Sequence, residues 1–133
     1  MAGRERQFPG VPESVGQVRE FVASCLPPAC PPAVACDVAL CVSEPASNAV
    51  LRSASGAPGG TFVVRVRVDD AHQAVGVDVV DQGPALAPLP RVAPGGYGLR
   101  LVQALAAAYE VVTTPRSRSV SCRLDFQQVE AAR

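Results

Sequence analysis

Apolar and polar residues alternate along two neighbouring segments in the middle of the chain, residues 61–69 and 73–81. The apolar positions are Phe62, Val64, Val66, Val68, Val75, Val77 and Val79. A period of two predicts two β-strands, each with one buried face. The same period places Asp81 on the apolar side, where a carboxylate without a partner is costly. Asp78 falls on the polar side, where we expect it to pair with Arg65 or Arg67.

Helical spacing appears on both sides of these strands. Apolar residues three and four apart predict a helix from Pro12 to Leu26, which a proline-rich turn at 27–32 ends. A second helix is predicted from about Ala33 to Ser53. Residues 4–9 are expected to add a short edge strand. Further along, the pattern predicts a helix at 98–108 and a hairpin of strands at 109–114 and 119–126.

These elements predict a fold of the α/β class. Helices on one face of a mixed, largely antiparallel sheet form a two-layer sandwich. The 133 residues are enough for one hydrophobic core, so we interpret residues 1–133 as a single domain.

Charge and cysteine usage narrow the function classes. Twelve basic residues balance twelve acidic ones, which argues against direct nucleic-acid binding or attraction to an anionic membrane. The N-terminus lacks the apolar segment of a secretion signal, and no apolar run approaches the length of a membrane span. Five cysteines without a C-x-x-C spacing favour free thiols over a zinc site. We therefore expect a cytoplasmic protein.

The second predicted helix carries an acid and an amide one turn apart. Glu44 and Asn48 lie at i and i+4, so both side chains leave the same helix face. An amide oxygen can ligate Mg²⁺ when phosphates and water complete the octahedron. A carboxylate one turn away can act as a general base. Arg52, a further turn along, is a candidate phosphate contact. Taken alone, such a pair is more often a solvated helix face.

An acid followed by a turn ends the second strand. Asp81 can accept a hydrogen bond from an exocyclic amine, and Gly83 allows the backbone to pass close to a planar base. By itself, Asp81-Gln82-Gly83 is also an ordinary turn signal.

Glycines precede the third predicted helix. The free N–H groups and positive dipole end of that helix suit a phosphate chain. The candidate residues here are Gly95, Gly96, Gly98, Leu99 and Arg100. Alternatively, such glycines only punctuate a loop, and a surface arginine is solvated.

In order and spacing, the three segments resemble the N, G1 and G2 boxes of histidine-kinase-like ATPases, the family of gyrase-type ATPases, Hsp90 and sensor kinases. The resemblance implies a Bergerat-type ATP site with Mg²⁺. In such a site Glu44 is the base, Asn48 binds the metal, Asp81 recognises adenine and residues 95–98 lie under the phosphates.

The size of the chain resembles that of the anti-sigma-factor serine kinases of bacterial partner-switching systems. Those proteins bind a sigma factor and phosphorylate a serine or threonine of an anti-anti-sigma protein. The sequence leaves open whether the chain acts alone or as a homodimer.

Some residues depart from the family pattern. Pro45 stands inside the motif helix, where it is expected to kink the helix at a cost of roughly 3 kcal/mol. Ala85 replaces a second glycine, and residues 84–94 contain four prolines. A binding module that sequesters a partner without transferring phosphate is therefore the alternative function. The catalytic domain of a sensor histidine kinase is a third, but the chain has no room for a dimerisation helix.

Overall fold

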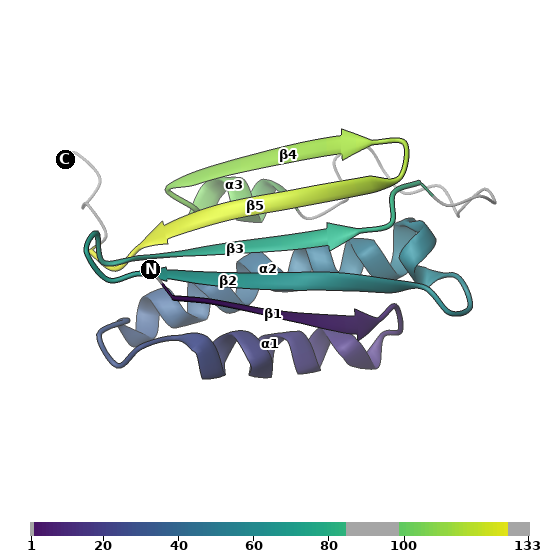
Figure 1. Ribbon diagram of the computed structural model, residues 1–133. Helices are drawn as coiled ribbons and strands as arrows, with labels where there is room; N and C mark the ends of the chain where they lie inside the picture. Colours follow the sequence, from purple (N-terminus) through teal and green to yellow (C-terminus); the bar gives the residue numbers. More distant parts are fainter. Residues whose placement is uncertain (1, 85–98, 128–133) are drawn as a thin grey trace.

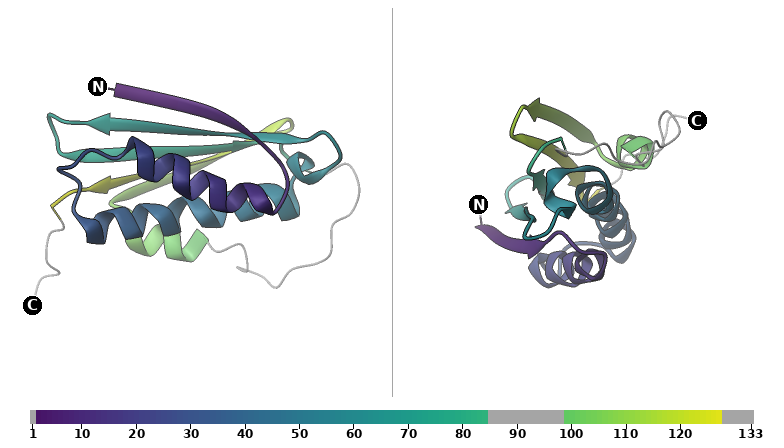
Figure 2. Two further views of the ribbon diagram at one scale, coloured as in Figure 1. Left: turned by 90° about the horizontal axis from the view of Figure 1, so that it is seen from below. Right: turned by 90° about the vertical axis from the view of Figure 1, so that its right-hand side faces the viewer.

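Five strands and three helices form two layers in the computed structural model, which describes residues 2–84 and 99–127. The elements are β1 (Ala2–Pro9), α1 (Glu13–Cys25), α2 (Pro32–Arg52), a 3-10 turn (Ala54–Gly56), β2 (Thr61–Asp69), β3 (Ala74–Asp81), α3 (Leu99–Leu105), β4 (Ala108–Thr114) and β5 (Ser117–Asp125). The strands form one sheet in the order β1-β2-β3-β5-β4 (Figure 1). All three helices lie on the same face of it (Figure 2). The predicted α/β sandwich is confirmed.

Each pair of neighbouring strands in the described part of the chain is antiparallel, so the sheet is more uniform than the mixed sheet that we predicted. The alternation of β2 and β3 directs most of their valines toward the helices, as expected. Val64, Val66, Val75 and Val77 are at most 1% exposed. Phe8 closes the core near the β1 edge, where its ring stacks on Phe62 at 5.7 Å between centroids.

The long helix α2 packs on β3 and β5 and contacts both α1 and α3. It begins one residue before the predicted helix and continues as one helix through Pro45, whose ring is buried. Pro45 has no N–H to donate to the carbonyl of Cys41, so α2 lacks one internal hydrogen bond at this point. By length and composition alone α2 could cross a membrane, but its apolar residues fill the core between the sheet and the other helices.

The third helix is shorter than predicted. It ends at Leu105 rather than at residue 108, because the chain then turns to join the sheet. The N–H of Ala107 donates to the carbonyl of Arg123 on β5 at 2.8 Å. Three consecutive alanines have high helix propensity, and this contact with the sheet overrides it.

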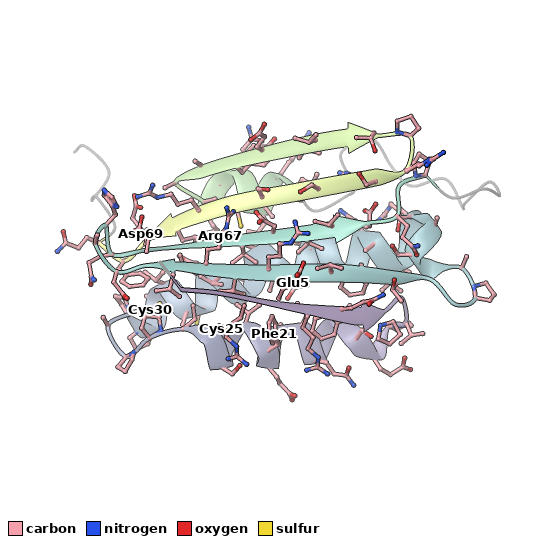
Figure 3. All side chains as sticks on the ribbon, viewed as in Figure 1. Glu5, Phe21, Cys25, Cys30, Arg67 and Asp69 are labelled. Carbon is pink, nitrogen blue, oxygen red and sulfur yellow. The ribbon has the colours of Figure 1, made fainter. Side chains whose placement is uncertain are left out.

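Ion pairs cover the sheet face opposite the helices. Arg65 Nε lies 2.7 Å from Glu5 Oε1, and Arg67 Nη2 lies 2.9 Å from Asp78 Oδ1. Glu5 and Arg67 lie on the side of the sheet that faces the viewer in Figure 3, with the helices behind it. The expected pairing of Asp78 with an arginine of β2 is therefore confirmed.

Candidate functional site

The C-terminal end of α2 and the end of β3 are joined by direct hydrogen bonds. The N–H of Ala54 donates to the carbonyl of Gly83 at 2.8 Å, and the N–H of Gln82 donates to Ser55 Oγ at 2.9 Å. A bridge between Ser53 and Pro84 continues this contact. These bonds fix the last turns of the predicted motif helix beside the predicted acidic turn.

Asp81 lies on the helix-covered face of the sheet and is only 7% exposed. Its Oδ1 accepts a hydrogen bond of 2.7 Å from the N–H of Gly83, two residues ahead, which closes the turn. Arg118 stands directly opposite on β5. Burial raises the pKa of the Asp81 carboxyl, while the hydrogen bond from Gly83 and the charge of Arg118 oppose the rise. Asp81 is thus a buried hydrogen-bond acceptor, and Gly83 and Arg118 stabilise its charged form.

Asn48 is the buried polar residue of α2, at 4% exposure. Its Oδ1 accepts a hydrogen bond from Arg52 Nη1 at 2.9 Å, one helical turn further along. The oxygen that would ligate Mg²⁺ therefore already has a cationic donor. Binding a metal ion at this atom requires the Arg52 guanidinium to move away from it.

Glu44 is half-buried and lies one turn before Asn48 on α2. The i, i+4 spacing places both side chains on the same face of the helix, as the sequence predicted. Its immediate neighbour is the buried Pro45, which adjoins the gap in the hydrogen-bond pattern of the helix.

The turn after β3 needs a glycine for a structural reason. Gly83 has φ of +81°, and a Cβ atom there would lie 2.9 Å from the backbone of Arg116 and Ser117. This close approach to the β4–β5 hairpin is enough to account for the glycine. A role beside a bound base stays a prediction.

The remaining candidates lie at or before the start of α3. Leu99 is the first residue of α3 and packs on the core, while Arg100 is exposed. Gly95, Gly96 and Gly98 lie outside the described residues. The predicted phosphate-binding segment is therefore placed only at its C-terminal end.

The sequence gave no reason to single out Arg118 or Ser55. Arg118 reaches the site only through the register of β3 with β5, and Ser55 only through the contact between the end of α2 and β3. Both contacts join residues distant in the chain, so no local motif could reveal them.

A hollow on the opposite face of the sheet is a less suitable site. It has a volume of about 370 Å³ over β3, β5 and β4, and Arg67 and Arg123 border it. Asp78 pairs with Arg67, and Asp125 lies 3.1 Å from Arg123, so both cations are compensated. The end of α2 and β3 remains the better candidate.

The residues at this end fit a nucleotide with Mg²⁺. Asp81 supplies a buried carboxylate for a hydrogen-bond donor, and Asn48 supplies one neutral oxygen of the kind that Mg²⁺ accepts beside phosphates and water. Among the described residues, no three His, Cys, Asp or Glu side chains gather as a separate metal site. A metal ion here would depend on oxygens of the nucleotide.

Comparison with known proteins identifies the family of the chain and relatives of its fold. Residues 8–124 match the family model described as histidine kinase-like ATPase domain. Among solved structures, the chain resembles a crystal structure of the RsbU and RsbW domains of Rv1364c from Mycobacterium tuberculosis, with a TM-score of 0.70 and 15% identity. The match covers 94% of this chain and 32% of that one, so the chain spans about a third of its length. No curated protein sequence matches the chain.

Proposed function

Because the chain belongs to the family of histidine kinase-like ATPase domains, we propose that it binds ATP with Mg²⁺ at the joined ends of α2 and β3. The observation that carries this proposal is Asp81, a carboxylate 7% exposed at the end of β3 and on the same side as the buried Asn48. Burial still raises the pKa of this carboxyl although Gly83 and Arg118 face it, so a further donor would stabilise its charged form. An adenine amine is such a donor.

Each residue of the site then has a separate task. Asp81 accepts a hydrogen bond from the exocyclic amine of adenine, while Asn48 offers its Oδ1 to Mg²⁺. Arg52, once displaced from Asn48, and Arg100 would contact the phosphates. Bound Mg²⁺ would neutralise part of the phosphate charge.

A titration calorimetry experiment with ATP and ITP tests this site. ITP carries a carbonyl oxygen where adenine has its amine, so the Asp81 carboxylate should favour ATP. In Asp81→Asn the amide can present either a donor or an acceptor, so the preference for ATP should fall roughly 5- to 150-fold, equivalent to about 1–3 kcal/mol. Asp78→Asn, on the other face of the same strand, is the matched control and should keep the preference.

Absence of binding heat with folded wild-type protein, with or without Mg²⁺, would contradict the proposed site. Equal ATP preference in Asp81→Asn and in wild type would show that another residue reads the base.

As the function of this site we propose a cytoplasmic anti-sigma factor with serine/threonine kinase activity toward an anti-anti-sigma protein. The support is the position of Glu44, half-buried one turn from Asn48. Its carboxylate takes the proton of a substrate hydroxyl as that oxygen bonds to the γ-phosphorus and ADP leaves. The partner classes follow from the resemblance of the motifs and from the RsbW domain in the structural neighbour.

Phosphotransfer with candidate anti-anti-sigma proteins tests the kinase step. Glu44→Ala should lower the rate roughly 10²- to 10⁴-fold while ATP binding persists, because the base acts on the hydroxyl rather than on the nucleotide. Glu20→Ala on the exposed side of α1 is the control and should retain full activity. A Glu44→Ala protein with the wild-type rate would contradict the assignment of the base.

Two observations favour a second function, a binding module that sequesters its partner without phosphotransfer. The hydrogen bond from Arg52 already engages Asn48 Oδ1, and Pro45 interrupts the bonding of α2 next to Glu44. Folded protein that captures a sigma factor but neither binds ATP nor transfers phosphate would establish this alternative.

A further inference from the structure

A row of polar side chains crosses the sheet where β3 ends. Asp81 of β3 lies directly opposite Arg118 of β5, and Arg118 lies directly opposite Thr113 of β4. Residues that are directly paired in antiparallel strands have their side chains on the same face of the sheet. A carboxylate, a guanidinium and a hydroxyl group therefore follow one another across three strands, on the face that carries the buried Asp81.

The neighbouring row on the same face is apolar. Val79 of β3 is paired with Val120 of β5, and Val120 is paired with Val111 of β4. Val79 and Val120 are 3% and 5% exposed, whereas Val111 is 36% exposed at the outer end of the row. An apolar surface bordered by a few well-placed polar groups suits a flat heterocyclic ligand, because the faces of such a ligand are apolar and its edge carries donors and acceptors.

Arg118 is held close to Asp81 by the packing of the β4–β5 turn. A Cβ atom at Gly83 would lie 2.9 Å from the backbone of Arg116 and Ser117, so this turn contacts the turn that follows Asp81. Burial raises the pKa of the Asp81 carboxyl, and the N–H of Gly83, the charge of Arg118 and the backbone N–H of Arg118 oppose the rise. Arg118 is half-buried and has several N–H donors, so it can donate to a ligand while its charge still acts on Asp81.

We propose that Arg118 recognises the base of the nucleotide together with Asp81, by donating a hydrogen bond to the ring nitrogen N1 of adenine. This inference rests on the proposed ATP site and adds a specificity-determining residue to it. Adenine presents a donor, its exocyclic amine, next to an acceptor, the unprotonated N1. Asp81 and Arg118 present an acceptor next to a donor, so the two edges are complementary.

The same pair of residues disfavours other purines. Hypoxanthine and guanine have a carbonyl oxygen where adenine has its amine, and an N–H group where adenine has N1. In the orientation that adenine adopts, the carbonyl oxygen would face the Asp81 carboxylate and the N–H group would face the Arg118 guanidinium. Both contacts would then be mismatched, and polar groups left without a partner in a binding site reduce affinity strongly.

Titration calorimetry with ATP and two analogues separates the contacts of the two residues. 1-Deaza-ATP has a C–H group in place of N1 and keeps the amine, whereas purine riboside triphosphate keeps N1 and lacks the amine. Wild type should bind 1-deaza-ATP about 10- to 100-fold more weakly than ATP, because Arg118 loses its acceptor. In Arg118→Met, which keeps an unbranched side chain without donors, the two ligands should bind with nearly equal affinity.

The analogue without the amine and a second arginine provide the controls. Arg118→Met should retain most of the loss of affinity that wild type shows for purine riboside triphosphate, since that contact belongs to Asp81. Arg116→Met removes the same charge from the exposed turn between β4 and β5, and it should discriminate against both analogues as wild type does. Circular dichroism melting verifies that both variants fold.

Two results would overturn this inference and leave the proposed ATP site in place. One is a wild-type protein that binds ATP and 1-deaza-ATP equally but still disfavours the analogue without the amine. The other is an Arg118→Met protein that binds ATP and 1-deaza-ATP more weakly by the same factor, which would make Arg118 only a counter-ion of Asp81. Folded wild-type protein that binds none of the three nucleotides would overturn both proposals.

Discussion

A carboxylate that is 7% exposed keeps its charge only through the groups that face it. For Asp81 those groups are the N–H of Gly83 and the cation of Arg118, and burial still raises its pKa above the ordinary value of 3.8. The folded protein therefore binds this proton more tightly than the unfolded chain does. Because folding raises the pKa of Asp81, protonation of this carboxyl stabilises the folded state. This stabilisation is complete below pH 3.8 and is lost as the pH rises through the pKa that Asp81 has in the folded protein.

This linkage predicts how stability changes with pH in Asp81→Asn. The amide has no proton to bind, so the variant lacks the gain that wild type makes on acidification. As the pH falls from 7 to 4, the free energy of unfolding of wild type should rise relative to that of Asp81→Asn. Urea denaturation of both proteins across this range measures the difference. A difference that is constant with pH, or that moves in favour of the variant, would show that the carboxyl is not destabilised by burial.

At the residue scale the sequence predicted where some of the candidate residues lie. Glu44 and Asn48 could be related because helix geometry alone places i and i+4 on one face. The buried orientation of Asp81 followed from the period of its strand. The hydrogen bond between Arg52 and Asn48 was not predicted, since the sequence indicated only a phosphate contact for Arg52.

Among the elements, the turn after β3 requires a glycine for two reasons, a positive φ and a close backbone contact. Gly83 and Gly59 have nearly the same positive φ, +81° and +79°. A Cβ at Gly83 would meet hairpin backbone at 2.9 Å, whereas a Cβ at Gly59 has nothing within 4 Å. The two positions therefore separate the cost of backbone conformation from the cost of a close contact.

We expect Gly59→Ala to lower the free energy of unfolding by roughly 1–2 kcal/mol, the cost of a left-handed conformation. Gly83→Ala should cost more, by an additional amount of about 1–3 kcal/mol, because the hairpin backbone must move. Urea denaturation monitored by circular dichroism gives both values. Equal losses in the two variants would mean that the hairpin accommodates the methyl group without strain.

The elements were predicted well where periodicity was strong. The bounds of β2 matched at both ends because its apolar and polar residues alternate without interruption. The end of α3 was wrong because residues 106–108 are all alanine, a composition that favours helix, and only the hydrogen bond from Ala107 to Arg123 draws the chain into the sheet.

For the whole molecule, helices cover one face of the sheet (Figure 2), and the ion pairs Arg65–Glu5 and Arg67–Asp78 lie on the other face. The candidate nucleotide site lies where the covered face meets the end of β3. A fold shared by many proteins does not by itself assign an activity, so this site requires its own experiment. The fold class could be predicted from the pattern of apolar and polar residues. The order of the strands in the sheet could be learned only from the observed pairing of the strands.

Strand order also determines when the sheet can begin to assemble during translation. Residue 2 of β1 pairs with residue 68 of β2, and both α1 and α2 are synthesised between them. A nascent chain therefore has its two long helices before any ladder of this sheet exists, and their apolar faces have no sheet to cover them. β3 gains its second neighbour only when β5, the last strand, leaves the ribosome. Until then the central strand of the finished sheet is an open edge.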